Sequence, residues 1–582
     1  MASIQKRSGF RLSSDEPDSL RINSEWAIMS GAVTLVAWLT LIPMGFLIWQ
    51  SFMTPQTNSK PAQFTFGNYI EAYGSPETFE LFSTSVVFAL GSSLFALFLG
   101  TALAWMNERT NTPFKPVFYA LSIIPLVVPG ILFVVSWIML ASPKIGLVNL
   151  VLRGVFGTEY TFVDCYSLMG MIWVDGLHYA PIAFLLMTAA FRSMDSSLEE
   201  AAMMSGASTM KIATRITLRL VWPAIAASAL ILFVRSIESF EVPALLGLPV
   251  GIQVFTSSIY DAIHRYPSDV GLASAYALLL LLITSVGIWL QSRISSQSNK
   301  YSTVTGKGFR PRVLDLGKWR FVCAAFFFIY VLISVALPFF ILVWSSLQRY
   351  YSVPSWAALK NVSLRAYDTV LGYPNVAGAV WNSFVLSLGT ATIVMFLTAI
   401  ICWIVLRTRI PGRWVIDNMA SLPLVMPGLV LGLSIMICYL TIGGGIYGTL
   451  WILLIAYVTR FLPYGMRYNT TSMIQMHREL EESAAMSGAT WFQSFRKIVL
   501  PLLKPGLVAG WIYVVVVSVR ELSSSILLYS PGSEVVSVII WELWQNGQYV
   551  ELSAFGVMLI SALFVFTLLA QEVGRQFGIK EQ

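Results

Sequence analysis

The sequence predicts an all-α polytopic membrane protein, and three observations support this fold class. The chain has 582 residues, of which 56% are hydrophobic and 12% charged, whereas soluble globular proteins carry about 25% charged residues. Its mean hydropathy is +0.71. Twelve stretches are long and apolar enough to cross a bilayer, where a helix must satisfy its own backbone hydrogen bonds. The formal net charge of +7 therefore indicates basic membrane loops and not a nucleic-acid partner.

The first half of the chain contains six of these stretches. The polar, basic segment 1–25 shows no signal peptide with a small-residue cleavage site and leads directly into the first span. We therefore expect that span to remain in the mature protein. The predicted spans are residues 27–49, 82–106, 117–140, 167–190, 224–247 and 270–291.

The second half contains the other six. The segment between the halves is polar, basic and rich in Ser and Gly, which is typical of a linker. The spans predicted after it are residues 321–345, 382–406, 415–440, 446–468, 506–529 and 552–570. The resulting division is a tail (1–25), a first six-helix half (26–291), a linker (292–318), a second six-helix half (319–572) and a C-terminal tail (573–582).

The basic residues predict the orientation of the chain. Lys and Arg in short loops stay on the cytoplasmic side. With the N-terminus inside, the cytoplasmic segments hold about 26 Lys and Arg and the external segments about 7. We therefore expect both termini and the linker to be cytoplasmic.

The two halves are homologous repeats. "PLVVPG" at 125–130 matches "PLVMPG" at 423–428, and "EEAAMMSGAS" at 199–208 matches "EESAAMSGAT" at 481–490. The first offset is 298 residues and the second 282, so the first half carries about 16 extra residues, which we place in the external loop 141–166. Because each half has six spans, both have the same topology, and the chain looks like a fused dimer with a pseudo-twofold axis along the membrane normal.

The repeated "EEAA/EESA" phrase predicts a short helix, a turn and a second helix at the cytoplasmic surface. Ser196 can cap the first helix, and Gly206 and Gly488 can end it. Thr490 and Gln493 have the spacing of a capping box. So short a helix is not stable alone. It either offers apolar and charged side chains to a partner's groove or rests on lipid headgroups.

The second copy reads Glu-Ser-Ala, three residues, Gly, nine residues and Ile-x-Leu-Pro, and it resembles the EAA loop of the transmembrane subunits of bacterial ABC importers. The first copy departs from this pattern at Arg219, where the family has Pro. The resemblance implies the type I ABC importer permease fold, with each loop docking on an ATPase subunit. The coupling residues that it implies are Glu199, Glu200, Ala201, Ala202, Gly206, Glu481, Glu482, Ala484 and Gly488.

Two further segments, "FVRSIESFEVPALLGLP" at 233–249 and "RELSSSILL" at 520–528, are similar to ferric-iron importer permeases. This resemblance implies ferric iron uptake at the bacterial inner membrane, with two copies of a cytosolic ABC ATPase and an extracytoplasmic solute-binding protein as partners. Permeases for thiamine, phosphonates, polyamines or sugar phosphates remain the alternative.

The chain lacks a GxxxxGK[ST] phosphate-binding loop. We therefore expect no catalysis and no cofactor on this chain, with ATP and magnesium bound by the partner ATPase. Without the resemblance, twelve spans in two repeats also describe an ion-coupled secondary transporter. A membrane scaffold is a third alternative, although charged residues within spans argue against it.

Charged residues within the spans are the candidate translocation pathway, because each costs roughly 2.5 to 3.5 kcal/mol in a bilayer and needs a reason. The pathway candidates are Arg235, Glu238, Glu241, Arg520 and Glu521, and Asp175, His178 and Arg460 are further mid-span charges. We expect Arg235 to pair with Glu238, and Glu238 to approach Arg520 across the pseudo-twofold axis. Such pairs either line the pathway or only hold helices together.

No firm metal site is predicted from the sequence. A ferric ion would prefer the oxygen ligands of Glu and Tyr over the three histidines, of which His264 and His477 are expected at the surface. The four cysteines form no CxxC pair and are expected to be small buried side chains.

Overall fold

The computed structural model describes residues 18–56, 61–194, 197–298, 313–408 and 410–576. Within these ranges the regular structure is helical, apart from two isolated β-bridges. Nine helices in the described ranges are long and apolar enough to cross a membrane, and three further pairs of helices are bent at a short break. The predicted all-α fold class is confirmed.

The nine apolar spans correspond to predicted spans in both halves. They are α1 (Asp18–Gln50), α3 (Pro76–Arg109), α7 (Leu168–Ser193), α10 (Leu218–Ile237) with the turns before it, α12 (Val270–Ser298), α13 (Trp319–Val331) continued by α14 (Leu337–Ser346), α16 (Pro374–Arg407), α22 (Leu500–Val519) and α25 (Tyr549–Gln576). A tenth predicted span forms α19 (Leu450–Ile474), a 25-residue helix that carries Arg460.

The predicted spans 117–140 and 415–440 are wrong as continuous helices. The first is divided into α4 (Lys115–Ile123) and α5 (Gly130–Ala141), which meet at a bend of 100°, and the second into α17 (Arg413–Ser421) and α18 (Gly428–Ile442), with a bend of 110°. Both breaks fall in the repeated PLVxPG sequence. Each of its two prolines removes a backbone donor and clashes with the preceding turn, so the helix cannot continue straight.

The predicted spans 224–247 and 506–529 also end early. Helix α10 stops at Ile237 and α22 at Val519, and α22 is followed by the short helices α23 (Ser525–Leu528) and α24 (Val536–Gln545). After α10 the chain forms a bent pair, Pro243–Val250 and α11 (Phe255–His264), at 71°. In the second half, the carboxylate of Glu521 accepts hydrogen bonds from the backbone N–H and hydroxyl of Ser524, both at 3.1 Å. These bonds compete with continuation of the helix.

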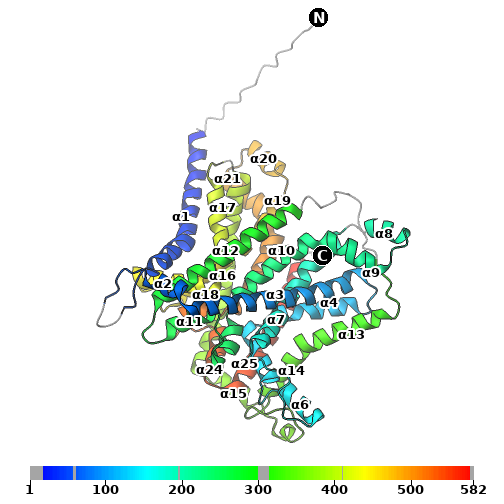
Figure 1. The fold of residues 1–582 in the computed structure, drawn as a ribbon. Helices are drawn as coiled ribbons and strands as arrows, with labels where there is room; N and C mark the ends of the chain where they lie inside the picture. Colours follow the sequence, from blue (N-terminus) through cyan, green and yellow to red (C-terminus); the bar gives the residue numbers. More distant parts are fainter. Residues whose placement is uncertain (1–17, 57–60, 195–196, 299–312, 409, 577–582) are drawn as a thin grey trace.

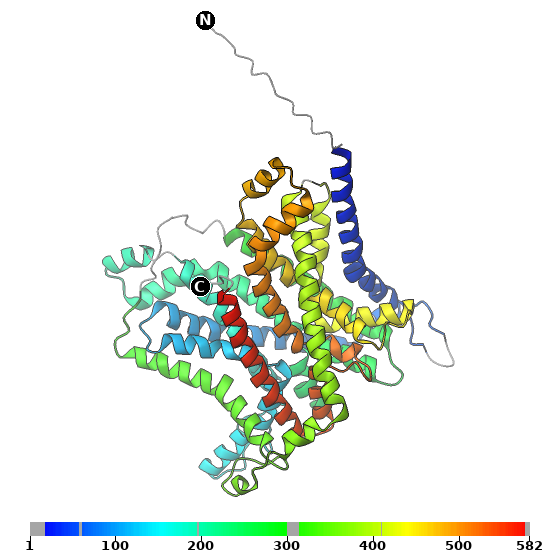
Figure 2. The ribbon, with the colours of Figure 1, turned by 180° about the vertical axis from the view of Figure 1, so that it is seen from behind.

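Each half is built around three mutually packed helices, α3, α7 and α10 in the first half and α16, α19 and α22 in the second. In Figure 1 the helices α3, α4, α7 and α13 run across the view, whereas α16, α17 and α22 run up it. The same divergence is visible from behind in Figure 2. The two bundles therefore point in different directions from a shared centre.

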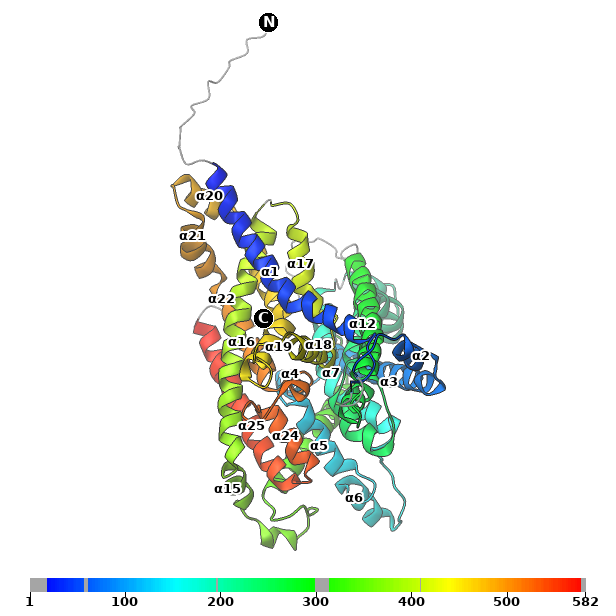
Figure 3. The same ribbon diagram turned by 90° about the vertical axis from the view of Figure 1, so that its left-hand side faces the viewer.

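The first helix of each half packs against the other half. Helix α1 contacts α17 and α18, and α13 and α14 contact α4 and α5. Figure 3 shows α1 passing beside α17 and α18. Each broken helix is therefore covered by an arm from the opposite repeat.

Two connections differ between the halves. The loop 141–166, which carries the extra residues of the first half, contains α6 (Leu147–Phe156). On the linker side, α12 continues as helix through Ser298, so residues 292–298 of the predicted linker are helical. The end of the linker bonds to the first half, since Leu314 N–H donates to the Arg109 carbonyl at 2.8 Å and Asn111 N–H to the Leu314 carbonyl at 3.1 Å.

Candidate functional site

The repeated phrase forms one short helix in each half, α8 (Ser197–Met204) and α20 (Glu479–Met486), which we call the surface helices. Each ends at a glycine with positive φ, Gly206 at 78° and Gly488 at 80°. The N–H of the residue after each glycine donates to a carbonyl five residues back, Ala202 and Ala484 respectively, both at 3.0 Å. This pattern is a Schellman motif, in which glycine avoids the strain of the left-handed region. Ser196, the predicted cap of α8, lies outside the described residues.

The segments after the surface helices begin as predicted in the second half. The Thr490 N–H donates to the side-chain oxygen of Gln493 at 2.9 Å, and the Gln493 N–H donates to the Thr490 hydroxyl at 3.3 Å. This confirms the capping box. It starts α21 (Trp491–Ser494), which continues through a short turn into α22. The equivalent segment in the first half is α9 (Thr209–Ile212).

The surface helices expose the same apolar residue in both halves. Met204 is 92% exposed and Met486, 282 residues later, is 90% exposed. Among the predicted coupling residues, Ala201, Gly206, Glu482 and Gly488 are exposed, and Ala202 and Ala484 are partly buried. The side chain of Glu200 lies outside the described residues. The exposed methionines and the glutamate beside them suit a partner with an apolar groove.

The first glutamate of each repeated Glu-Glu pair, Glu199 or Glu481, points into the protein. Glu199 is 4% exposed and forms an ion pair with the buried Arg109. Glu481 lies 3.1 Å from the guanidinium of Arg407. These two predicted coupling residues therefore contact their own half.

A second candidate site lies where the halves meet. It is a cavity of about 180 Å³ lined by residues of both halves, which we call the central cavity. Its lining residues are Gly130, His178, Tyr179, Ile182, Arg235, Glu238, Ser239, Glu241, Arg460, Phe461, Tyr464, Tyr513, Val517, Arg520, Glu521 and Ser523. All five predicted pathway residues are in this set, together with two of the three further mid-span charges.

The helix breaks bring these side chains together. Glu238 and Arg520 occupy equivalent positions, 282 residues apart, immediately after α10 and α22 end. The glycines that start α5 and α18 form another wall: a Cβ on Gly130 would lie 3.6 Å from the His178 ring, and one on Gly428 would collide with the Arg460 guanidinium. Each PLVxPG break therefore faces the equivalent residue of the fourth span in its own half.

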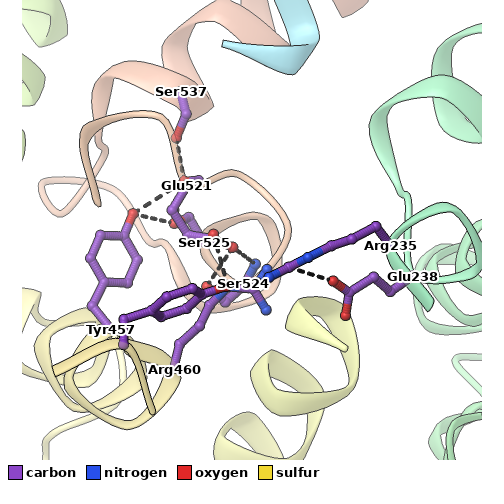
Figure 4. A network of polar contacts seen from close by, with 9 residues as sticks. Arg235, Glu238, Tyr457, Arg460, Glu521, Ser524, Ser525 and Ser537 are labelled. Carbon is purple, nitrogen blue, oxygen red and sulfur yellow. Dashed lines mark hydrogen bonds and ion pairs between the residues drawn. The ribbon is translucent and has the colours of Figure 1, made fainter. Parts of the chain in front are cut away.

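Two ion pairs lie at the cavity wall (Figure 4). Arg235 pairs with Glu238 at 2.7 Å, which confirms the predicted pairing, and Arg460 pairs with Glu521 at 2.9 Å. The backbone carbonyl of Glu521 also accepts hydrogen bonds from the hydroxyls of Tyr457 at 3.1 Å and Ser537 at 2.7 Å. Glu521 is thus fixed by partners on two elements, α19 and α24.

Two arginines connect the halves across the cavity. Arg235 of the first half donates to the Tyr464 hydroxyl of the second, and Arg520 of the second half donates to the Leu126 carbonyl of the first. The expected approach of Glu238 to Arg520 does not produce an ion pair among the described residues. The PLVVPG break supplies the competing acceptor, because its bend frees the Leu126 carbonyl from helical hydrogen bonding.

Glu241 is the cavity carboxylate for which the described residues supply no ion pair. Asp175 is buried behind the cavity and does not line it. Within the described part of the chain, no three His, Cys, Asp or Glu side chains are grouped so that they could hold a metal ion. The cavity offers guanidinium, carboxylate and phenol groups, which suit recognition of a passing ion.

Several residues of these two sites were not predicted, among them the exposed Met204 and Met486 of the surface helices. Tyr464 and Tyr513 line the cavity but resemble ordinary aromatic residues in the sequence. Arg109 and Arg407 lie just beyond the predicted spans 82–106 and 382–406, so they were not identified as charges within spans. Their equivalence, 298 residues apart, could have identified them only once the partner glutamates were known.

Comparison of the chain with known proteins identifies a matching family. The model of one family, binding-protein-dependent transport system inner membrane component, matches residues 92–299 and again 317–574. The chain is 28% identical over 453 residues to the ferric transport system permease protein FbpB of Actinobacillus pleuropneumoniae, which covers 77% of this chain and 64% of that protein. It is 25% identical over 506 residues to the Fe(3+)-transport system permease protein FbpB 2 of Haemophilus influenzae. This match covers 86% of this chain and 91% of that protein.

A solved structure of a bacterial ABC transporter that imports the polysaccharide alginate is also similar. It aligns with 45% of this chain and 98% of its own, with a TM-score of 0.37 and 17% sequence identity.

Proposed function

We propose, from the premise that the chain belongs to the family of binding-protein-dependent transport system inner membrane components, that it is a two-half permease of an ATP-driven importer of ferric iron. The observation that carries this proposal is the pair of surface helices with equivalent exposed methionines, Met204 and Met486. One such helix per half gives one docking point for each of two ATPase subunits. The family excludes the ion-coupled secondary transporter and the scaffold that the sequence alone left open.

Two copies of a cytosolic ABC ATPase bind the surface helices, and ATP and magnesium reside on those subunits. The permease itself binds no cofactor and makes or breaks no covalent bond. An extracytoplasmic solute-binding protein delivers the cargo to the external loops. Both termini lie on the cytoplasmic side of the inner membrane, as the distribution of Lys and Arg indicates.

Transport follows from movement of the halves relative to each other. Closure of the ATPase subunits on ATP brings the surface helices together, and the helices packed behind them move as rigid bodies. The contacts that cross the central cavity, from Arg235 to Tyr464 and from Arg520 to Leu126, are then broken or exchanged. The cavity opens alternately to the two sides.

Ferric ion is the favoured cargo because the similarities to two ferric transport permeases extend over 77% and 86% of this chain. The cavity is compatible with this cargo, since Glu241 and the tyrosines are oxygen donors suited to a hard cation. Permeases for thiamine, a phosphonate, a polyamine or a sugar phosphate are the second candidate, and the three cavity arginines are the observation that favours an anionic solute among them.

The test replaces both exposed methionines in one chain, Met204→Glu with Met486→Glu. A methionine buried in a partner groove contributes about 1.5–3 kcal/mol, so loss of two should reduce retention of the ATPase during purification more than tenfold. Uptake of radioactive ferric ion by whole cells should fall with it.

The control is Met169→Glu, which changes a 72% exposed methionine at the start of α7, the end away from α8, and should leave ATPase retention unchanged. Full retention in the double variant would contradict the docking role of the surface helices. Cargo is tested separately, by stimulation of ATP hydrolysis in the reconstituted complex with ferric ion, spermidine or 2-aminoethylphosphonate bound to the binding protein. If another solute stimulated ATP hydrolysis and ferric ion did not, the proposed cargo would be wrong while the proposed importer function would stand.

A further inference from the structure

The two surface helices share an internal contact that the docking proposal does not use. In the first half, Glu199 forms an ion pair with Arg109, the last residue of α3, and accepts a hydrogen bond from the Thr217 hydroxyl at 2.5 Å. In the second half, Glu481 pairs at 3.1 Å with Arg407, the last residue of α16. We call Arg109–Glu199 and Arg407–Glu481 the helix-end ion pairs.

The helix-end ion pairs recur although their surroundings differ. The arginines are 298 residues apart and the glutamates 282, so both pairs join equivalent positions of the repeat. The additional hydrogen bond comes from Thr217 in the first half, whereas in the second it comes from the Trp403 indole at 3.4 Å. The charge pair is therefore the shared element.

The pairs are removed from water. Arg109 is fully buried, and the side chains of Arg407 and Glu481 are 8% and 18% exposed. The guanidinium of Arg407 also donates to the carbonyls of Met473 and Met476, both at 2.9 Å, at the end of α19. A charge so enclosed is strongly destabilised when its partner is removed.

The position of the pairs has a mechanical consequence. Each surface helix is joined by the chain to the fourth and fifth spans, α7 and α10 or α19 and α22. No loop joins a surface helix directly to α3 or α16, the second span of each half. The helix-end ion pair supplies that connection, so all three core helices of a half are attached to its surface helix.

We propose that the helix-end ion pairs are coupling struts, which pass the displacement of each surface helix to α3 and α16 and so make each three-helix core move as one body. This inference rests on the proposed importer function and adds to it the route by which force enters the membrane. Glu199 and Glu481 are positioning residues in this scheme and make no contact with the ATPase.

The first half has an additional brace. The linker end bonds to the backbone of Arg109 and Asn111, and the Asn111 side chain donates to Asp315 at 2.5 Å. Arg192 near the end of α7 pairs with Glu108 at 3.0 Å. Among the described residues, the linker end bonds beside the first-half pair and not beside Arg407–Glu481. The experiment is therefore made on the second-half pair.

The experiment uses the whole complex of permease, ATPase and binding protein in proteoliposomes, with radioactive ferric ion as the probe. In Glu481→Gln, ATPase retention is expected to stay at the wild-type level, while ferric ions transported per ATP hydrolysed fall by about fivefold or more, as for ordinary coupling energies. The reversed pair, Arg407→Glu with Glu481→Arg, is expected to recover most of this ratio.

The matched control is Glu479→Gln, which removes the same charge from an exposed position of the same helix and should leave the ratio unchanged. An unchanged ratio in Glu481→Gln would overturn the proposal, and lower thermal stability alone would assign the pair a merely structural role. Loss of ATPase retention in Glu481→Gln would also overturn it, because Glu481 would then face the partner. Failure of the importer function itself would appear already in the wild-type complex, as absence of bound ATPase.

Discussion

The charges of the central cavity are unevenly satisfied. Arg460 is held by Glu521, and Arg235 by Glu238 and the Tyr464 hydroxyl. Arg520 uses a backbone carbonyl of the opposite half. Glu241 is left as the carboxylate without an ion-pair partner among the described residues, although it lines the same space. A passing cation can therefore bind there without breaking an existing pair.

We expect Glu241→Gln to lower ferric ion uptake about tenfold, which corresponds to about 1.4 kcal/mol. ATPase retention should not change, since Glu241 lines the central cavity and belongs to neither surface helix. The measurement is uptake of radioactive ferric ion into proteoliposomes at fixed ATP. Glu238→Gln should also impair uptake, through release of Arg235.

Glu80→Gln, at an exposed position near the external start of α3, is the control and should keep normal uptake. If Glu241→Gln transports at the wild-type rate, the cavity charges only hold helices together.

At this scale the sequence was a good guide to which charged residues line the central cavity, and it predicted the Arg235–Glu238 pair but not the partner of Arg520. A charge in an apolar stretch is costly wherever the helix points, so Arg235, Glu238 and Arg520 could be identified from composition alone. The partner of Arg520 could not, because a free carbonyl at Leu126 exists only after the helix bends. Hydropathy contains no information on that bend.

The broken helices α4–α5 and α17–α18 determine the shape of the cavity. Their positions follow from the repeated PLVxPG sequence, but composition predicted only that an apolar segment of span length is present. The direction in which the chain continues after the prolines depends on whether neighbouring elements can support the bend. Here the arms α1 and α14 cover the two breaks, and this support is a tertiary property.

Helix α18 provides a test of the break. Its first residue, Gly428, faces the Arg460 guanidinium so closely that a Cβ would displace it, whereas the nearest atom to a Cβ on Gly130 is 3.5 Å away. Because Arg460 is held by Glu521, it cannot move freely. We expect Gly428→Ala to destabilise the protein by about 1–3 kcal/mol, as overpacking does.

Gly130→Ala serves as the matched control and should be close to neutral. Thermal unfolding of both variants in detergent, followed by size-exclusion fluorescence, measures the difference. Equal melting temperatures would mean that the Arg460–Glu521 pair does not constrain the start of α18.

The whole molecule consists of two repeats that exchange their first helices. The sequence predicted the repeats, their common topology and the extra external segment that forms α6. It could not predict the exchange, because α1 and α13 are apolar on all sides and carry no pattern that specifies a neighbour. Beyond the linker, the repeats are joined by the contacts of α1 with α17 and α18 and of α13 and α14 with α4 and α5.

We therefore expect the chain to tolerate division. Co-expressed fragments 1–298 and 313–582 should assemble and co-purify through a tag on one of them, since both exchanged arms and the linker end at Leu314 remain available. Affinity purification followed by mass analysis measures the ratio of the fragments. A version lacking residues 1–50 should bind less of the second fragment, and equal recovery would show that α1 is dispensable for association.

The nonidentity of Glu238 and Arg520 has an evolutionary consequence. In a permease assembled from two identical polypeptides, the residue at this position would line the central cavity twice. Two glutamates or two arginines there would repel each other. Joining the repeats in a single gene removes that restriction. A mutation in one repeat then changes only one wall of the central cavity. Selection can therefore give opposite charges to two positions that descend from the same ancestral residue.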